Sequence, residues 1–93
     1  MTRIIVKQLI WDEYNTEHIN KHHVTVEEVE LAIKNIIAHK KGKKGKYLAL
    51  GRAGKRLISV VIGRERTGVY YPVTARDSEK KERKVIYEKE KSR

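Results

Sequence analysis

The strongest constraint on the fold of this chain is a series of three short runs rich in β-branched and aromatic residues. They span residues 47–50, 57–63 and 69–75, and the connections between them, G-R-A-G-K and R-E-R-T-G, both contain glycine. Short connections with glycine are typical of β-hairpins. The pattern therefore predicts an antiparallel meander in which the most apolar run, 57–62, is central.

Pro72 interrupts the last of these runs. Because proline has no amide hydrogen to donate to a neighbouring strand, this run is expected to lie at a sheet edge or to be bulged at Pro72. Regular alternation would place Tyr70 on the face of Thr74 and Arg76. It would place Tyr71 in the core.

The first half of the chain predicts one strand and two helices. Residues 3–10 are nearly all apolar or β-branched, which is typical of a strand. Asp12 is suited to an N-cap and predicts a short helix over residues 13–22. Thr25 and Glu28 have the spacing of a capping box, so a second helix should begin at Val26. Its apolar face would consist of Val29, Ala32, Ile33 and Ile36.

The remaining segments predict a loop and a last helix. Residues 39–45 contain two glycines and four lysines, which indicates a basic loop over 38–46. From about residue 78 a charged pattern predicts a helix that frays over 89–93. We therefore expect one α+β domain over residues 1–93. An antiparallel sheet of about four strands would pack against three helices, in the order β-α-α-β-β-β-α.

Charge indicates the kind of partner. The formal net charge is +10, and residues 38–56 carry eight basic residues and no acidic one, so a polyanion is the expected ligand. The lack of cysteine excludes disulfides and thiolate chemistry. No apolar run approaches the roughly 20 residues that cross a bilayer, and no signal-peptide pattern is present, so we expect a cytoplasmic protein with no membrane partner.

Four segments together resemble the BrnT family. They are W-D-x-x-N-x-x-H-I-x-K-H at 11–22, V-T-V-E-E-V at 24–29, Y-L-A-L-G-R at 47–52 and V-T-A-R-D-S-x-K-K-E-R at 73–83. The resemblance implies a RelE-like fold and a toxin of a type II toxin–antitoxin system that cleaves RNA as a metal-independent endoribonuclease. It also implies no cofactor, a small ribbon-helix-helix antitoxin as partner, and a homodimer within the toxin–antitoxin complex. His23 stands where the family has glycine, a residue suited to a left-handed helix terminus.

Arg76 is the first candidate catalytic residue. It lies where the last strand-like run leads into the last helix, beside helix-start amides that favour an anion such as phosphate. RNA cleavage without metal needs a fixed cation to stabilise the extra charge on the phosphorane, and arginine suits this role. The alternative is a structural bridge to the acidic start of the helix, at Asp77 or Glu79.

His18, Lys21 and His22 form a second candidate group. Their i, i+3, i+4 spacing places them on one face of the first helix, and a histidine that titrates near neutrality can transfer protons. Alternatively, His18 packs on Trp11 or Tyr14 and Lys21 covers apolar surface with its stem. No metal site is expected here, because a third ligand at recognisable spacing is missing.

Glu82 is the last catalytic candidate, as a base. The cations around it would lower its pKa, and the alternative is that it forms a helix ion pair or orients Arg83.

The RNA-binding candidates carry positive charge or an aromatic ring on which a base can stack. They are Arg52, Lys40, Lys41, Lys43, Lys44, Lys46, Tyr70, Lys80 and Arg83. Arg52 is expected in a hairpin turn and has solvation as its alternative. Two rival functions fit the same charges: a basic RNA-binding module without catalysis, and an interaction protein whose positive face docks an acidic tail.

Overall fold

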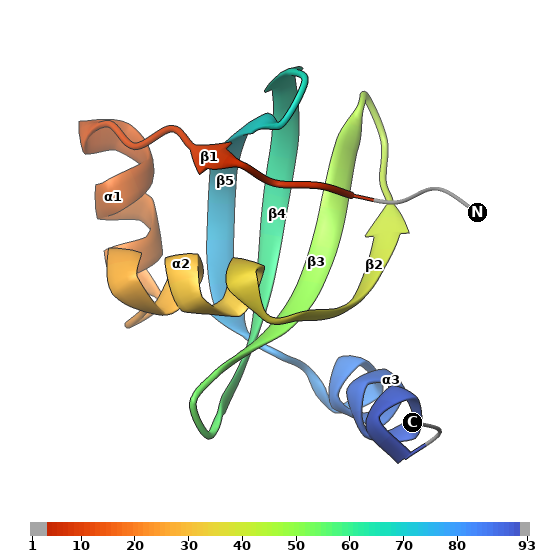
Figure 1. Cartoon of the computed structure of the whole chain (residues 1–93). Coiled ribbons are helices and arrows are strands. Elements are labelled where there is room, and N and C mark those ends of the chain that lie inside the picture. Colours follow the sequence, from red (N-terminus) through yellow and green to blue (C-terminus); the bar gives the residue numbers. More distant parts are fainter. Residues whose placement is uncertain (1–3, 92–93) are drawn as a thin grey trace.

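A five-stranded sheet forms the centre of the computed structural model, which describes residues 4–91 (Figure 1). The strand order is β1-β5-β4-β3-β2; β1 pairs with β5 in parallel and all other neighbours are antiparallel. The expected α+β meander is confirmed, with 57–62 in the central strand. In chain order the elements are β1 (Gln8–Leu9), α1 (Glu13–Lys21), α2 (Val26–Lys34), β2 (Ile36–Lys41), β3 (Lys46–Ala53), β4 (Arg56–Arg66), β5 (Val69–Asp77) and α3 (Lys80–Lys91).

The helices cover the two faces of the sheet unequally. Alternate residues of β4, Ile58 and Val60, are buried in the main core cluster with residues of α1 and α2. Leu57 faces the other way, into a smaller cluster with Ile86 of α3. Further along the α3 face of β4, Gly63 is only half-buried, because α3 lies against one end of the sheet (Figure 1). Part of that face is therefore open.

Both N-terminal helices begin at the capping residues that the sequence indicates. The Asp12 side chain accepts a hydrogen bond from the Asn15 amide, and the Asn15 side chain accepts one from the Asp12 amide. Thr25 and Glu28 form the same reciprocal pair at the start of α2. Each box satisfies helix-start amides that have no partner within the helix. Both predicted helix starts are confirmed.

The segment expected to be a basic loop forms most of a fifth strand. α2 ends at Lys34, so Ile36 opens β2 instead of extending the helix face, and Lys40 and Lys41 pair with Leu48 and Tyr47 of β3. Only residues 42–45 remain as the turn. The prediction of a loop over 38–46 is wrong, because pairing with β3 satisfies the backbone of a segment whose side chains alone look like a linker.

The two ends of the chain also differ from expectation. β1 is only two residues long and lies beside Val69–Tyr70, while Ile4 and Val6 pack on the core without strand pairing; residue 3 lies outside the described residues. The predicted fraying from residue 89 is not found up to Lys91: α3 continues to that residue, because Glu90 forms an ion pair with Arg52. Residues 92–93 lie outside the described range. Within residues 4–91, no helix is long and apolar enough to span a bilayer.

A bulge in β5 reverses the predicted faces of two tyrosines. Val61 pairs with Thr74 but Ile62 pairs with Pro72, so Val73 is an extra residue in β5. Alternation therefore restarts at the bulge. Tyr70 lies in the core, 6% exposed, with its ring edge-on to that of Tyr47. The placement of Tyr70 beside Arg76 is wrong, and Tyr71 takes that position instead.

His23 adopts a left-handed backbone conformation with φ of 60°. This is the conformation that glycine would adopt without strain at the end of a helix. Arg56 Nη1 donates a hydrogen bond to the His23 carbonyl at 2.8 Å, which ties the α1–α2 turn to β4. The turn is therefore held by contacts that offset the strain at His23.

Candidate functional site

Arg76 points from β5 toward the start of α3 and holds Glu82 with both ends of its guanidinium. Nη1 donates to Oε1 at 2.7 Å and Nη2 donates to Oε2 at 3.0 Å. Nη1 also donates to the Asp77 carbonyl at 3.2 Å and lies 3.8 Å from the Glu79 carboxylate. The hydrogen bonds to Glu82 raise the pKa of Arg76, so it stays positively charged.

The guanidinium of Arg76 is not fully used by these contacts. Its side chain is 35% exposed, and Nε donates to no group within residues 4–91. Arg76 therefore keeps one charged donor without a described partner on a guanidinium that is already fixed in orientation.

Glu82 is the centre of a partly buried polar network. Its Oε1 also accepts hydrogen bonds from the Ser59 hydroxyl and from the Glu79 amide, each at 2.8 Å, and the hydroxyls of Ser59 and Ser78 are 2.8 Å apart. Burial alone would raise the pKa of Glu82, but the hydrogen bonds from Arg76, the Glu79 amide and Ser59 hold that pKa at about 2. A carboxylate of this kind is a poor proton acceptor at neutral pH. Its geometry is that of a residue that orients Arg76, where the sequence suggested Arg83.

The histidine group lies on α1, on the opposite layer from Arg76. The His18 ring stacks on Tyr14 with centroids 6.3 Å apart and is 5.7 Å from the His22 ring. Lys21 and His22 are exposed, and His18 is half-exposed. The i, i+4 placement of the two histidines is confirmed, and so is the packing of His18 on Tyr14. None of the contacts described within residues 4–91 joins these side chains to Arg76.

The RNA-binding candidates fall into distinct places. Exposed lysines lie on β2, on the 42–45 turn and at the start of β3: Lys40, Lys41, Lys43, Lys44 and Lys46. Lys80 is exposed at the start of α3, whereas Arg83 donates to the Ser78 carbonyl at 2.6 Å. Arg52 lies within β3, not in a turn, and forms a two-pronged ion pair with Glu90. Tyr70 is buried and has no exposed face for a base.

Arg56 is a structural hub that the sequence did not single out. Its Nε donates to Asp77 at 2.7 Å, and its Nη1 donates to both oxygens of Glu28 at 2.9 Å. These bonds, with the one to the His23 carbonyl, join the end of β5 to the α1–α2 turn. The hydrogen bonds to Asp77 and Glu28 raise the pKa of Arg56. The only signal in the sequence was the capping box, which fixed one of the two carboxylates.

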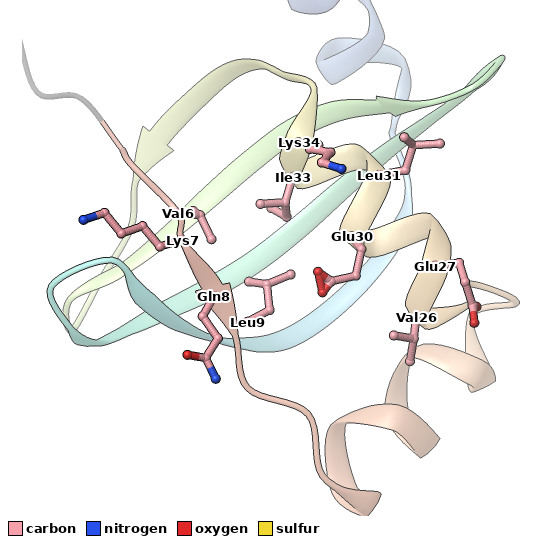
Figure 2. Close-up of a pocket in the computed structure, with 10 residues that line it drawn as sticks. All are labelled: Val6, Lys7, Gln8, Leu9, Val26, Glu27, Glu30, Leu31, Ile33 and Lys34. Carbon is pink, nitrogen blue, oxygen red and sulfur yellow. The ribbon is translucent and has the colours of Figure 1, made fainter.

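A groove on the α2 side of the sheet lies away from Arg76. It has a volume of about 500 Å³ and runs between residues 6–9 and α2, with Leu9 and Ile33 pointing toward it (Figure 2). Glu27, Glu30 and Lys34 line its α2 side. Neither Arg76, Glu82 nor the α1 histidines line this groove, and no metal-binding group of three or more His, Asp or Glu side chains occurs in residues 4–91.

The fold and the site together define a small basic α+β domain with an arginine held at the end of its sheet. The structure is similar to the crystal structure of the Brucella abortus ribonuclease toxin BrnT, with a TM-score of 0.61. The match covers 78% of this chain and 97% of BrnT at 21% sequence identity, and it confirms the expected BrnT-like fold. No protein-family model and no curated protein sequence matches the chain.

Proposed function

We propose that this protein is a ribonuclease toxin that cleaves single-stranded RNA without a metal ion. The observation that supports this most directly is Arg76, a permanently charged guanidinium that is partly exposed beside an open, lysine-bordered sheet face and is held by Glu82. The fold of a ribonuclease toxin agrees with it. In this proposal Arg76 binds the scissile phosphate and stabilises the phosphorane, and Glu82 keeps its guanidinium in place.

Proton transfer in this proposal belongs to the C-terminal turn of α1. Arg56 binds both the His23 carbonyl and the Asp77 carboxylate, which ties this turn to the end of β5. In this proposal the RNA passes around that end of the sheet, between Arg76 on one face and the α1 histidines on the other. A histidine there, His22 in the first place and His18 next to it, would take the proton from the 2′-hydroxyl or give one to the leaving 5′-oxygen. Lys21 would contact phosphate.

The proposed partner is a small antitoxin of the ribbon-helix-helix class. An acidic segment of such a protein would cover the basic face formed by β2, the 42–45 turn and α3, and a homodimer of the toxin would form within that complex. The protein would act in the cytoplasm, where both RNA and antitoxin are available.

The experiment that tests the function is incubation of the purified protein with single-stranded RNA in EDTA. We expect fragments that end in a 2′,3′-cyclic phosphate, because the 2′-oxygen attacks phosphorus and expels the 5′-oxygen. Arg76→Ala should remove this product, whereas Arg66→Ala, which deletes an exposed arginine at the far end of β4, should keep it. RNA that stays intact with the unmodified protein would exclude the nuclease.

One observation favours a second candidate, an RNA-binding module without catalysis. Glu82 compensates the charge of Arg76, and its pKa of about 2 leaves no good base in direct contact with that arginine. Retained RNA binding with no cleavage in EDTA would select this function. Salt-sensitive binding of an acidic peptide with no RNA binding would select the interaction protein instead.

A further inference from the structure

A shallow hollow lies on the same sheet face as Arg76, at the opposite end of the strands. It has a volume of about 440 Å³ and lies between the 42–45 turn and the ends of β4 and β5. Gly63 and Tyr71 form part of its lining and are cross-strand partners, as are Ser59 and Arg76. Positions 59 and 63 of β4 share one face, and paired residues face the same side. The hollow and Arg76 are therefore on one continuous surface, roughly 13 Å apart along β4.

The charges around the hollow suit a nucleic acid backbone. Lys41, Lys44, Lys46 and Arg64 line it, against one carboxylate, Glu65. The three lysines come from the end of β2, the turn and the start of β3, so they border one side of the hollow. Phosphates would be held on this side without any preference for sequence.

The other side of the hollow offers an aromatic ring held in place. The Tyr71 hydroxyl donates to the Asp12 carboxylate, with distances of 3.1 Å and 3.0 Å to its two oxygens. Because the ring is already fixed, a base that stacks on it meets little loss of side-chain freedom. The carboxylates of Asp12 and Glu65 near this ring disfavour phosphate, so the uncharged base belongs on the tyrosine side.

Gly63 leaves the space in which a base can lie. A Cβ atom built on it would meet only the Lys46 side chain, at 3.9 Å. Its backbone lies in β4 without the positive φ that requires glycine. The strand backbone therefore does not require glycine at position 63, and the lack of a side chain there leaves space in the hollow.

We propose that this hollow is a subsite for one base of single-stranded RNA, whose phosphates lie on the lysine side and whose chain continues along the sheet face to Arg76. This inference rests on the proposed function for the identity of the polymer. It adds a residue set, Gly63, Tyr71 and Lys46, that positions RNA at a distance from the bond that is cut.

The test is to fill the hollow. Valine suits a strand and has room at position 63, so Gly63→Val should fold normally by circular dichroism and urea unfolding. Binding is measured by fluorescence anisotropy with short labelled RNA carrying 2′-O-methyl riboses, which lack the 2′-hydroxyl needed for cleavage. We expect Gly63→Val to weaken binding about tenfold, the effect of losing one stacked base. Tyr71→Leu should do the same, and Tyr71→Phe, which keeps the ring, should retain most of the affinity.

Two controls separate a base from a phosphate or another anion. An oligomer with abasic positions should bind the unmodified protein and Gly63→Val with equal affinity. If Gly63→Val instead weakened binding of the abasic and the complete oligomer equally, the hollow would hold phosphate only, and the base subsite would be overturned. Lys46→Gln should weaken RNA binding more than Lys55→Gln, which removes the same charge from the β3–β4 turn. If Gly63→Val no longer bound an acidic peptide but bound RNA as tightly as the unmodified protein, the proposal would also be overturned.

The subsite and the nuclease can fail separately. If the unmodified protein binds RNA but does not cleave it, and Gly63→Val weakens this binding, the subsite is supported and the proposed function is excluded. RNA that is cleaved in an Arg76-dependent way, with Gly63→Val fully active and tight-binding, removes the subsite alone. No RNA binding by the unmodified protein overturns both.

Discussion

Arg56 and Arg76 occupy neighbouring strands, and both bind carboxylates, but they differ in what their contacts join. Arg56 joins Glu28, Asp77 and the His23 carbonyl, and so connects three separate parts of the chain. Arg76 binds Glu82 and the carbonyl next to it, leaving Nε without a partner in residues 4–91. The contacts of the first arginine, made by its Nε and Nη1, join parts of the fold. The second is held by one network and still presents charge to the sheet face.

The largest expected effect is on the rate of RNA cleavage, which substitution of the two arginines should lower unequally. Arg76→Ala should lower the rate of RNA cleavage at least about 100-fold, because the charge that stabilises the transition state is lost. Arg56→Ala should lower the rate less, because it loosens the turn that carries His22 but leaves the charge of Arg76 in place. The rates are compared by single-turnover cleavage of labelled RNA; equal losses in both variants would mean that Arg76 acts through the fold.

The second effect concerns acid. The folded pKa of Glu82, about 2, is below its ordinary value of 4.5, so its contribution to stability is complete above pH 4.5 and is lost as pH falls from about 4.5 toward 2. Integrated over this window, the loss is on the order of 3 kcal/mol at most. Urea unfolding at stepped pH would measure it. Glu82→Gln should flatten the curve in this window; an unchanged curve would show that other carboxylates control it.

The third effect is the stability cost of the structural arginine. Arg56→Ala leaves Asp77 and the His23 carbonyl without the Arg56 donor and Glu28 with the Thr25 amide alone, which should cost about 2 kcal/mol in the free energy of unfolding. Arg76→Ala should cost about 1 kcal/mol, because Ser59 and the Glu79 amide still hold Glu82. Urea unfolding of both variants at pH 7 gives the comparison, and the reverse order would contradict the assignment of roles.

The smallest effect tests the strain beside Arg56. His23→Gly should raise the free energy of unfolding by about 0.5–1 kcal/mol, because glycine adopts φ of 60° without a clash. His22→Gly is the matched control: its φ is −99°, so glycine there should only lower stability. A gain from both, or from neither, would show that backbone strain at His23 is not significant.

Local chemistry accounts for what the sequence could predict. Asp12 and Thr25 cap helices through residues three positions away, and Arg76 lies at a strand-to-helix junction that needs no distant partner to be recognised. Pro72 indicated an edge or a bulge, and the structure has the bulge. The sequence therefore predicted best those structural features that residues close together in the chain define.

The misses depend on contacts between distant residues. β2 exists because Lys40 and Lys41 pair with β3, and its side chains alone look like a linker. The two carboxylate partners of Arg56 are 21 and 28 positions away, and Glu90 binds Arg52 from 38 positions away. Composition and periodicity carry no information about such pairs.

The bulge at Val73 changes which residues of β5 lie on each face of the sheet. Tyr71 and Arg76 are five positions apart, an odd number that would put them on opposite sides of a regular strand. Because Val73 is an extra residue between them, Tyr71 and Arg76 lie on the same face of the sheet, and Tyr70 is buried in the core. Deletion of Val73 would keep every other residue and yet exchange the lining of the hollow, so a change in length of one residue in this strand would alter recognition more than most substitutions on its face.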